Sequence, residues 1–481
     1  MRTPGALLEE LRGQRVHVVG ASGAEGLALL LFLAESAGFE GVVAHDFSGD
    51  DRGFARSFRR ANPAWPRAER EALLKRLRTL PVAFRLGADY LSGLEEADVV
   101  FASQNWFNYP SNLPAIPDAV ARGARLLGVV DLAMDLFPGL RIGVTGSNGK
   151  STTSAMIRHL LGDGVMQGGN DRSAQVSLQD LRDAPAGARL IWEVSNRHLR
   201  DRTVPVDVAV LTNITANHID DHGTWEAYVA AKLRLVRGAS AHAVVTVTDP
   251  ESSRHVDSLA AQVWGVGRRA GADQAGSWIE DGRIRLRAPG QDPVDVAPIS
   301  ALKLPGEHNR TNLLSALCAA VAAGSDPQAL APRIATFGGL AGRLERVAEQ
   351  GGVRWIWDIQ ATTAPAAEAG IRAEGEGRRL LLLVGGDDKG MDYRGMADAA
   401  AEHADAVLAL PGSGTDAFLG ALGDRVPVHR HDALDAALAH ARSLARPGTS
   451  VLCSPGCAFF FSRFVDGGPS FARRVAAVLA S

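Results

Sequence analysis

The chain has 481 residues, 46% of them hydrophobic and 22% charged, and a formal net charge of −3. At roughly 100 to 200 residues per domain, this length predicts about three domains. The near balance of charge excludes a protein that is drawn by its overall charge to nucleic acid or to an anionic membrane, so we expect neither partner.

The N-terminal segment and the cysteines indicate a reducing compartment. The opening stretch "MRTPGALLEELRGQRVHVVG" carries scattered charges and soon reaches an apolar strand, so we expect no signal peptide and no membrane span. Cys318, Cys453 and Cys457 lack the paired spacing of a zinc site and predict reduced thiols. We therefore expect a cytoplasmic protein.

Short apolar runs alternate with helical patterns along the whole chain, which predicts an α/β fold with mostly parallel strands. The first block, 1–128, repeats strand, turn and helix as a Rossmann-like domain does, in "RVHVVGASGAEG", "GVVAHD", "ADVVFAS" and "ARLLGVV". Within it, residues 51–85 are rich in arginine and are interrupted by Pro63 and Pro66. We expect this segment to be a helical insertion on the surface.

Two further blocks follow. Residues 129–338 contain the expected strands "RIGVTG", "RLIWEVS", "VDVAVLTNIT" and "HAVVTVTD" and the helix "HNRTNLLSALCAAVAAG". Residues 339–481 contain the expected strands "RWIWDI", "LLLLVGG", "AVLALPGSG" and "SVLCSPG" and predict a second Rossmann-like domain.

The turn "TGSNGKSTT" between a strand and a helix predicts a phosphate site. It is shorter than the usual G-x-x-x-x-G-K-[ST] loop, because Val144 stands where that loop begins with glycine. Small residues allow backbone N–H groups to reach phosphate oxygens, Lys150 would neutralise charge, and a hydroxyl of Ser151 or Thr152 would bind magnesium. The predicted phosphate-binding residues are Gly146, Ser147, Asn148, Gly149, Lys150, Ser151 and Thr152.

Further polar residues indicate a metal site. Glu193 ends the apolar strand "RLIWE", where a carboxylate needs a cation such as magnesium if it is buried. His218, Asp220, Asp221 and His222 cluster after the next strand, and Lys232 follows in a helical run. Taken singly, Glu193 could be a capped strand end and His218 a hydrogen-bonded loop histidine.

These motifs, in this order, resemble those of the Mur ligases, ATP-dependent enzymes that form amide bonds in peptidoglycan precursors. "TGSNGKSTT" is similar to that family's ATP loop, "NIT…HIDDHG…YVAAKLRL" to its magnesium and lysine segment, "GEHNRTNLLSAL" to its adenine-side motif and "GLAGRLERV" to its linker. "VRWIWDIQATTAPAAEAG", "LLLLVGGDDKGMDY" and "VLCSPGCAFF" are similar to the MurD branch, which adds glutamate to UDP-N-acetylmuramoyl-alanine.

The resemblance implies three domains, which bind the UDP substrate (1–128), ATP (129–338) and the amino acid (339–481). It implies ATP, two Mg²⁺ ions and a carbamylated Lys232 in a monomer that acts on small molecules. The implied catalytic residues are Lys150, His218 and Lys232, and the implied metal ligands are Ser151, Glu193, His218 and the carbamate of Lys232. The resemblance implies further nucleotide contacts at Asn309, Asn312, Arg343 and Asp358. It implies contacts with the UDP substrate at Gly23, Asp46, Ser103 and Asn170. It implies contacts with the amino acid at Thr362, Lys389 and Ser454.

The implied reaction moves the γ-phosphoryl group of ATP to a substrate carboxylate, and an amine then attacks the acyl phosphate and expels phosphate. The resemblance favours D-glutamate as the amine and UDP-N-acetylmuramoyl-L-alanine as the acid.

Alternatives remain, because the sequence departs from the family at substrate positions. "SQNW" replaces an S-P-G turn, "VSNRHL" adds Arg197 and His198, and Gln360 stands where a lysine is expected. An enzyme of the same fold could join another acid and amino acid, for example L-glutamate or a specialised metabolite. A nucleotide-binding switch without ligase activity and a Rossmann oxidoreductase are weaker alternatives.

Overall fold

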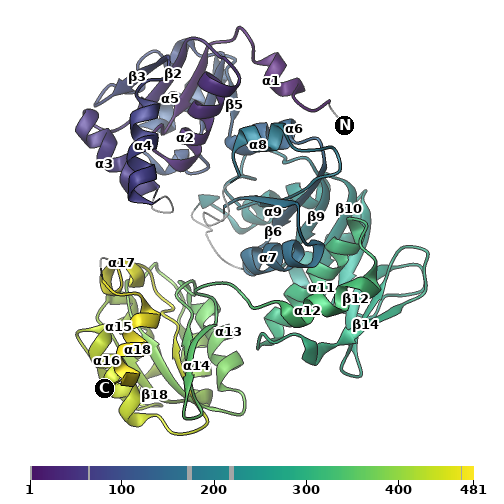
Figure 1. Cartoon of the computed structure of the whole chain (residues 1–481), viewed down its shortest axis with the longest axis vertical. Coiled ribbons are helices and arrows are strands. Elements are labelled where there is room, and N and C mark those ends of the chain that lie inside the picture. Colours follow the sequence, from purple (N-terminus) through teal and green to yellow (C-terminus); the bar gives the residue numbers. More distant parts are fainter. Residues whose placement is uncertain (1–2, 63–65, 171–175, 216–220, 467, 481) are drawn as a thin grey trace. The chain divides into compact units, whose positions relative to one another are not determined.

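The structure is a computed structural model that describes residues 3–62, 66–170, 176–215, 221–466 and 468–480. It is an α/β protein with three sheets, of five, nine and six strands, each accompanied by helices (Figure 1). This confirms the predicted fold class. In the described part of the chain, no helix combines the length and apolar character needed to cross a bilayer.

The chain divides into two compact units. The first consists of residues 1–279, 285–295 and 315–327, and the second of residues 280–284, 296–314 and 328–481. The five-stranded sheet and most of the nine-stranded sheet belong to the first unit, and the six-stranded sheet belongs to the second. The predicted domain boundaries, after residues 128 and 338, fall between the three sheets.

The five-stranded sheet has the strand order β3-β2-β1-β4-β5, with all neighbours parallel. This order brings the carboxyl ends of β1, β2 and β4 to one edge, which is where α/β sheets bind ligands. The strands are β1 (Val16–Val19), β2 (Val42–Asp46), β3 (Val82–Leu86), β4 (Val99–Ala102) and β5 (Arg125–Leu127). The helices of this part are α1 (Ala6–Glu10), α2 (Ala24–Leu31), α3 (Asp51–Ala61), α4 (Arg67–Leu77), α5 (Asn112–Ala121) and α6 (Val129–Leu136).

The arginine-rich segment 51–85 is not a surface insertion, which corrects the expectation above. It does form helices, α3 and α4, but Phe54 and Phe58 of α3 and Leu77 of α4 are buried in the core. The segment then supplies β3, which pairs with β2 as the edge strand of the sheet. The arginines lie on the outer face of helices whose apolar face packs inward, as amphipathic helices do.

The nine-stranded sheet has the order β14-β13-β12-β11-β10-β9-β6-β8-β7, and the pairs from β7 to β12 are parallel. Its strands are β6 (Leu140–Thr145), β7 (Val165–Gly169), β8 (Arg189–Glu193), β9 (Val206–Leu211), β10 (Ala239–Thr246), β11 (Gln262–Val266), β12 (Ala275–Glu280), β13 (Arg283–Arg287) and β14 (Val294–Pro298). The helices in this stretch are α7 (Lys150–Leu161), α8 (Leu178–Arg182), α9 (Trp225–Arg237), α10 (Pro250–Ser253), α11 (Glu307–Ala322) and α12 (Ala331–Thr336).

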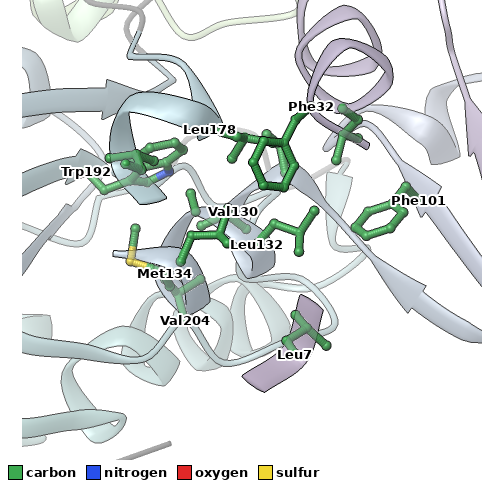
Figure 2. Packing of buried hydrophobic residues seen from close by; sticks show 14 of the residues in the cluster. Leu7, Phe32, Phe101, Val130, Leu132, Met134, Leu178, Trp192 and Val204 are labelled. Carbon is green, nitrogen blue, oxygen red and sulfur yellow. The ribbon is translucent and has the colours of Figure 1, made fainter. Parts of the chain in front are cut away.

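Helix α6 joins the cores of these two sheets. Val130, Leu132 and Met134 of α6 are nearly inaccessible to solvent. In Figure 2 they lie among Phe101 of β4 and Trp192 of β8, and all five belong to one hydrophobic cluster. The first two sheets therefore share a continuous apolar core.

The six-stranded sheet has the order β15-β16-β20-β17-β18-β19, with β15 antiparallel to β16 and the other neighbours parallel. Its strands are β15 (Glu345–Gln350), β16 (Val353–Trp357), β17 (Arg379–Val384), β18 (Ala404–Ala409), β19 (Val428–Arg430) and β20 (Thr449–Cys453). Its helices are α13 (Ala364–Gly375), α14 (Arg394–His403), α15 (Ser413–Leu422), α16 (Leu434–Leu444), α17 (Phe460–Phe464) and α18 (Phe471–Ala480). Separate apolar clusters stabilise this sheet.

Two buried histidines link β1 and β2. His17 and His45 are 5% and 0% exposed, and Nδ1 of His17 lies 2.9 Å from Nε2 of His45. Burial, followed by the charge of His45, lowers the pKa of His17 to about 4, and burial also lowers the pKa of His45. Both rings are therefore neutral in the folded protein at neutral pH.

We expect this pair to make folding stability depend on pH. An unfolded histidine titrates near pH 6.5 and folded His17 near pH 4, so the unfolded state binds more protons between these values. Stability is thus retained above about pH 6.5 and is lost as the pH falls toward 4. The His17→Gln variant should show a smaller drop in the urea midpoint between pH 7.5 and pH 5 than the wild type. The His159→Gln control, in α7, should keep the full drop, and equal drops in all three proteins would contradict the assignment.

Candidate active site

The predicted phosphate turn lies between β6 and α7 and depends on two glycines. Gly146 has φ 149° and Gly149 has φ 83°, in the region that favours glycine. A Cβ on Gly146 would lie 1.9 Å from Oγ1 of Thr212, at the end of the neighbouring strand. The turn can therefore approach the end of β9 only because residue 146 has no side chain.

Asn213, which follows β9, holds the turn in place. The backbone N–H of Ser147 donates to the carbonyl of Asn213 (2.9 Å), and that of Asn148 donates to Oδ1 of Asn213 (3.0 Å). The side chain of Asn213 donates back to the carbonyl of Asn148 (3.1 Å). Two of the amides that were expected to bind phosphate thus bind protein instead. The N-terminal end of α7 carries the positive end of the helix dipole and is the part of the loop suited to an anion.

Two lysines converge on one backbone carbonyl of this turn. Nζ of Lys150 donates to the carbonyls of Gly146 (2.9 Å) and Ser147 (3.1 Å), and Nζ of Lys232, in α9, donates to the carbonyl of Gly146 (2.8 Å). Lys232 is 1% exposed. Burial, and then the charge of Lys150, lowers the pKa of Lys232 well below its ordinary value. The Lys232 amine is therefore biased toward its neutral, nucleophilic form.

Tyr228 ties α9 to the same turn, a link that the sequence analysis missed. Its hydroxyl lies 2.8 Å from Oγ of Ser147, and its ring lies 4.7 Å from Nζ of Lys232. Oγ of Ser147 also donates to the carbonyl of Thr215 (2.9 Å). Burial raises the pKa of Tyr228 to about 12, so it remains a neutral hydrogen-bonding group. Its position one helical turn before Lys232 is the only sequence signal for this role.

Glu193 lies at the carboxyl end of β8, on the strand next to β6. It is 2% exposed, and its Oε1 accepts a hydrogen bond from Nδ2 of Asn170 (3.0 Å). Its Oε2 is buried and has no hydrogen-bond partner among the described residues. A buried carboxylate oxygen in this state needs a cation, and Mg²⁺ commonly binds through one or two carboxylates together with phosphate oxygens. Within the described ranges, no cluster of three or more histidine, cysteine, aspartate and glutamate side chains offers an alternative metal cage.

The histidine and aspartate loop is described only in part. His218 and Asp220 lie outside the described residues. Arg197 donates two hydrogen bonds to Asp221, from Nε to Oδ2 (2.7 Å) and from Nη2 to Oδ1 (3.2 Å). Arg197 also donates to Oδ1 of Asn105, in the loop that follows β4. Arg197 is one of the residues that depart from the family pattern, and its positive charge is thus neutralised within the protein.

The predicted UDP-substrate residues lie at or just after the carboxyl ends of strands. Gly23 immediately precedes α2 as its N-cap, and Ser103 follows β4. Asp46, the last residue of β2, is 0% exposed. Its carboxylate accepts hydrogen bonds from the N–H of Ser22 (2.8 Å) and from the hydroxyl of Ser48 (2.6 Å), so it stabilises the glycine turn. Asn170, the fourth predicted residue of this set, donates the hydrogen bond to Glu193 described above.

In the second unit, Asp358 and Ser454 are in contact. Oγ of Ser454 donates to Oδ2 of Asp358 (2.8 Å), and the N–H of Leu344 donates to Oδ1 (3.1 Å). Burial raises the pKa of Asp358 to about 7, although both hydrogen bonds lower it. The positive charge of Arg343 also lowers the pKa of Asp358, by a smaller amount than the hydrogen bonds.

The other predicted residues of this unit are placed separately. Lys389 is exposed after β17, and Thr362 is partly buried ahead of α13. In α11, Asn309 and Asn312 are 5% and 6% exposed. Nδ2 of Asn309 donates to the carbonyl of Pro305 (2.7 Å), across the start of the helix.

Comparison with known sequences agrees with this geometry. Residues 144–320 match the family model described as the Mur ligase middle domain, and residues 342–457 match the one described as the Mur ligase, glutamate ligase domain. The chain is 31% identical to the UDP-N-acetylmuramoylalanine–D-glutamate ligase of Acidobacterium capsulatum, with 96% of each chain covered. It is 32% identical to the ligase of the same name from Pelotomaculum thermopropionicum, with 97% of this chain and 98% of that protein covered.

Solved structures show the same fold. The UDP-N-acetylmuramate-alanine ligase MurC of Thermotoga maritima matches with a TM-score of 0.54 and 16% identity, over 97% of this chain and 99% of that chain. A pseudomurein peptide ligase type C from Methanothermus fervidus also matches with a TM-score of 0.54, at 17% identity, over 92% of this chain and 97% of that chain.

The close approach of Gly146 to Thr212 predicts a large loss of stability in the Gly146→Ala variant. The added Cβ must displace the Thr212 hydroxyl, and alanine disfavours φ 149°, so we expect a cost of about 2 kcal/mol or more. Chemical denaturation would measure it. Gly187→Ala is the matched control, because a Cβ there meets nothing within 4 Å. An equally small effect of both substitutions would show that the turn is not constrained as described.

Proposed function

The chain belongs to the Mur ligase family, and on that premise we propose that it is an ATP-dependent ligase that joins D-glutamate to UDP-N-acetylmuramoyl-L-alanine. The observation that carries the proposal is the convergence of Lys232 and Lys150 on the carbonyl of Gly146. Gly146 directly follows β6, and β6 pairs with β8, the strand that ends in the buried carboxylate of Glu193. The names of relatives that match nearly the whole chain support the choice of both substrates.

The phosphate turn would bind ATP. Lys150 and the first turn of α7 supply positive charge to the β and γ phosphates, and Ser151 and Thr152 supply hydroxyl groups. Asn309 and Asn312 of α11 would lie on the adenine and sugar side, and Arg343 and Asp358 would be further nucleotide contacts. The rigid support of the turn by Asn213 keeps the cation of Lys150 in a fixed position, which is what transfer of a phosphoryl group requires.

The residues present fit magnesium. Glu193 and the hydroxyl of Ser151 would hold one ion, and His218 and a carbamate on Lys232 would hold a second. Magnesium supplies a positive charge that offsets the repulsion between a phosphate and a carboxylate. The first of these sites is supported by the buried Oε2 of Glu193, which lacks a hydrogen-bond partner in the described part of the chain.

Lys232 would carry the carbamate. Its neutral amine would attack carbon dioxide, form an N–C bond and release one proton, so an uncharged buried amine would become an anionic oxygen ligand. The lowered pKa favours this step, because only the unprotonated amine has the lone pair that the reaction uses. The negative charge of the carbamate would also be attracted to the neighbouring Lys150.

The acid would bind at the edge formed by Gly23, Asp46, Ser103 and Asn170, and the amino acid would bind near Thr362, Lys389 and Ser454. This assigns UDP-substrate binding to residues 1–128, ATP binding to 129–338 and amino-acid binding to 339–481. The substrate carboxylate takes the γ-phosphoryl group, and the amine then displaces phosphate from the acyl phosphate. A cytoplasmic monomer that uses only small-molecule substrates, and neither nucleic acid nor a membrane, stays our prediction.

The pairing of Arg197 with Asp221 and Asn105 weakens the main alternative. That alternative rests in part on the presence of Arg197, an added cation that could bind a different anion, whereas its charge is neutralised by Asp221 inside the protein.

Phosphate release should therefore require ATP, Mg²⁺, UDP-N-acetylmuramoyl-L-alanine and D-glutamate together. A panel of amino acids with both glutamate enantiomers, assayed by phosphate release and mass spectrometry of the product, tests this. Turnover with L-glutamate or another amino acid, and none with D-glutamate, would replace the proposed substrate. ATP binding without turnover on any amino acid would overturn the acid as well.

Replacing Lys232 should abolish turnover while leaving the fold intact. Lys232→Arg keeps the positive charge but cannot form the carbamate, so we expect a loss of about a hundredfold or more, the scale of losing a metal ligand. A short carboxylate such as acetate should partly restore Lys232→Ala, and ¹³C-bicarbonate should give a carbamate NMR signal only in the wild type. Near wild-type turnover of Lys232→Arg, with an unchanged melting temperature, would contradict the role.

A further inference from the structure

Gln104 contacts three residues from different elements. It lies in the loop after β4, at the edge where the acid is expected to bind. Its backbone N–H donates to Oε2 of Glu25 (3.0 Å), its Oε1 accepts from the hydroxyl of Ser195, and its Nε2 donates to Oδ1 of Asn170 (3.3 Å). Both ends of its amide are therefore used, and its orientation is fixed.

The contact with Asn170 fixes the orientation of a second amide. Because Oδ1 of Asn170 accepts from Gln104, its Nδ2 faces the other way and donates to Oε1 of Glu193 (3.0 Å). The backbone N–H of Asn170 also donates to the carbonyl of Glu193 (3.0 Å). A flipped Asn170 would place its oxygen against the carboxylate oxygen of Glu193, an unfavourable contact between two acceptors.

The orientation of Asn170 decides which oxygen of Glu193 is left for a cation. With Oε1 engaged by Asn170, the buried Oε2 has no partner among the described residues. We propose that Gln104 is a positioning residue for the reaction: through Asn170 it holds the Glu193 carboxylate so that Oε2 is presented to the metal ion. The inference rests on the proposed function, because it takes Mg²⁺ as the cation that Glu193 binds.

This arrangement belongs to the loop "SQNW", one of the segments in which the sequence departs from the family pattern. A proline in place of Gln104, as in S-P-G, has no side-chain N–H to offer Asn170. In this chain the loop expected to bind the acid is therefore joined by two hydrogen bonds to the carboxylate expected to bind the metal. Hydrogen bonds of this kind, which orient a metal ligand without touching the metal, commonly change metal affinity by tenfold or more.

The test measures metal binding directly, without turnover. Mn²⁺ replaces Mg²⁺, a non-hydrolysable ATP analogue is present, and the free Mn²⁺ signal is followed by electron paramagnetic resonance. Gln104→Met keeps the length of the side chain but removes the amide, so we expect Mn²⁺ to bind roughly three- to tenfold more weakly. In the Asn170→Ala background the same substitution should have no further effect, because residues that act through one another are not additive.

Asn105→Ala is the matched control. It removes the neighbouring hydrogen bond from Arg197 in the same loop but leaves Gln104 and Asn170 in place, so it should bind Mn²⁺ as the wild type does. An equal weakening in Asn105→Ala and Gln104→Met would indicate general loosening of the loop and overturn the inference. Unchanged binding in Gln104→Met would also overturn it. A wild-type protein that does not bind Mn²⁺ with the nucleotide analogue would instead contradict the proposed function.

Discussion

Two lysine amines that share the carbonyl oxygen of Gly146 form the constraint on which the site depends. Two cations at one acceptor repel each other, and one of them, Lys232, is almost completely buried. Burial and the charge of Lys150 lower the pKa of Lys232, which reduces this repulsion. The geometry requires a glycine at 146, the turn after β9 that supports it, and helix α9, which places Lys232 at the same carbonyl.

Local sequence patterns predicted the parts of this arrangement that depend on neighbouring residues. The strand, turn and helix around Lys150 follow from apolar runs and from small residues at the turn, and Glu193 stands out because a carboxylate ends an apolar strand. The contributions of Asn213 and Tyr228 could not be predicted in this way, because they reach the turn from positions 65 and 81 residues away along the chain. Such contacts depend on strand order, which the periodicity of single segments does not specify.

The difference between local patterns and long-range contacts also explains why residues 51–85 were wrongly expected to be a surface insertion. Arginine density suggested a solvated face, yet Phe54 and Phe58, one helical turn apart, are buried in the core. Strand β7 was missed because "VMQGG" ends in two glycines, which disfavour strands by propensity; Gly169 is needed there because a side chain would collide with the backbone of Glu193. Close packing at the site thus overrides the propensities from which strands are predicted.

The shared core around α6 has a consequence for how such a protein can change over evolutionary time. A domain with its own closed core can be exchanged between proteins as a cassette, since its removal exposes little apolar surface. Here, Val130, Leu132 and Met134 belong to the same apolar cluster as Phe101 of the first sheet and Trp192 of the second. Recombination at the boundary near residue 128 would expose apolar side chains on both fragments. On the proposal that the acid binds at the edge of the first sheet, new acid specificity is more accessible through point changes in the loops there, such as "SQNW", than through replacement of the whole N-terminal domain.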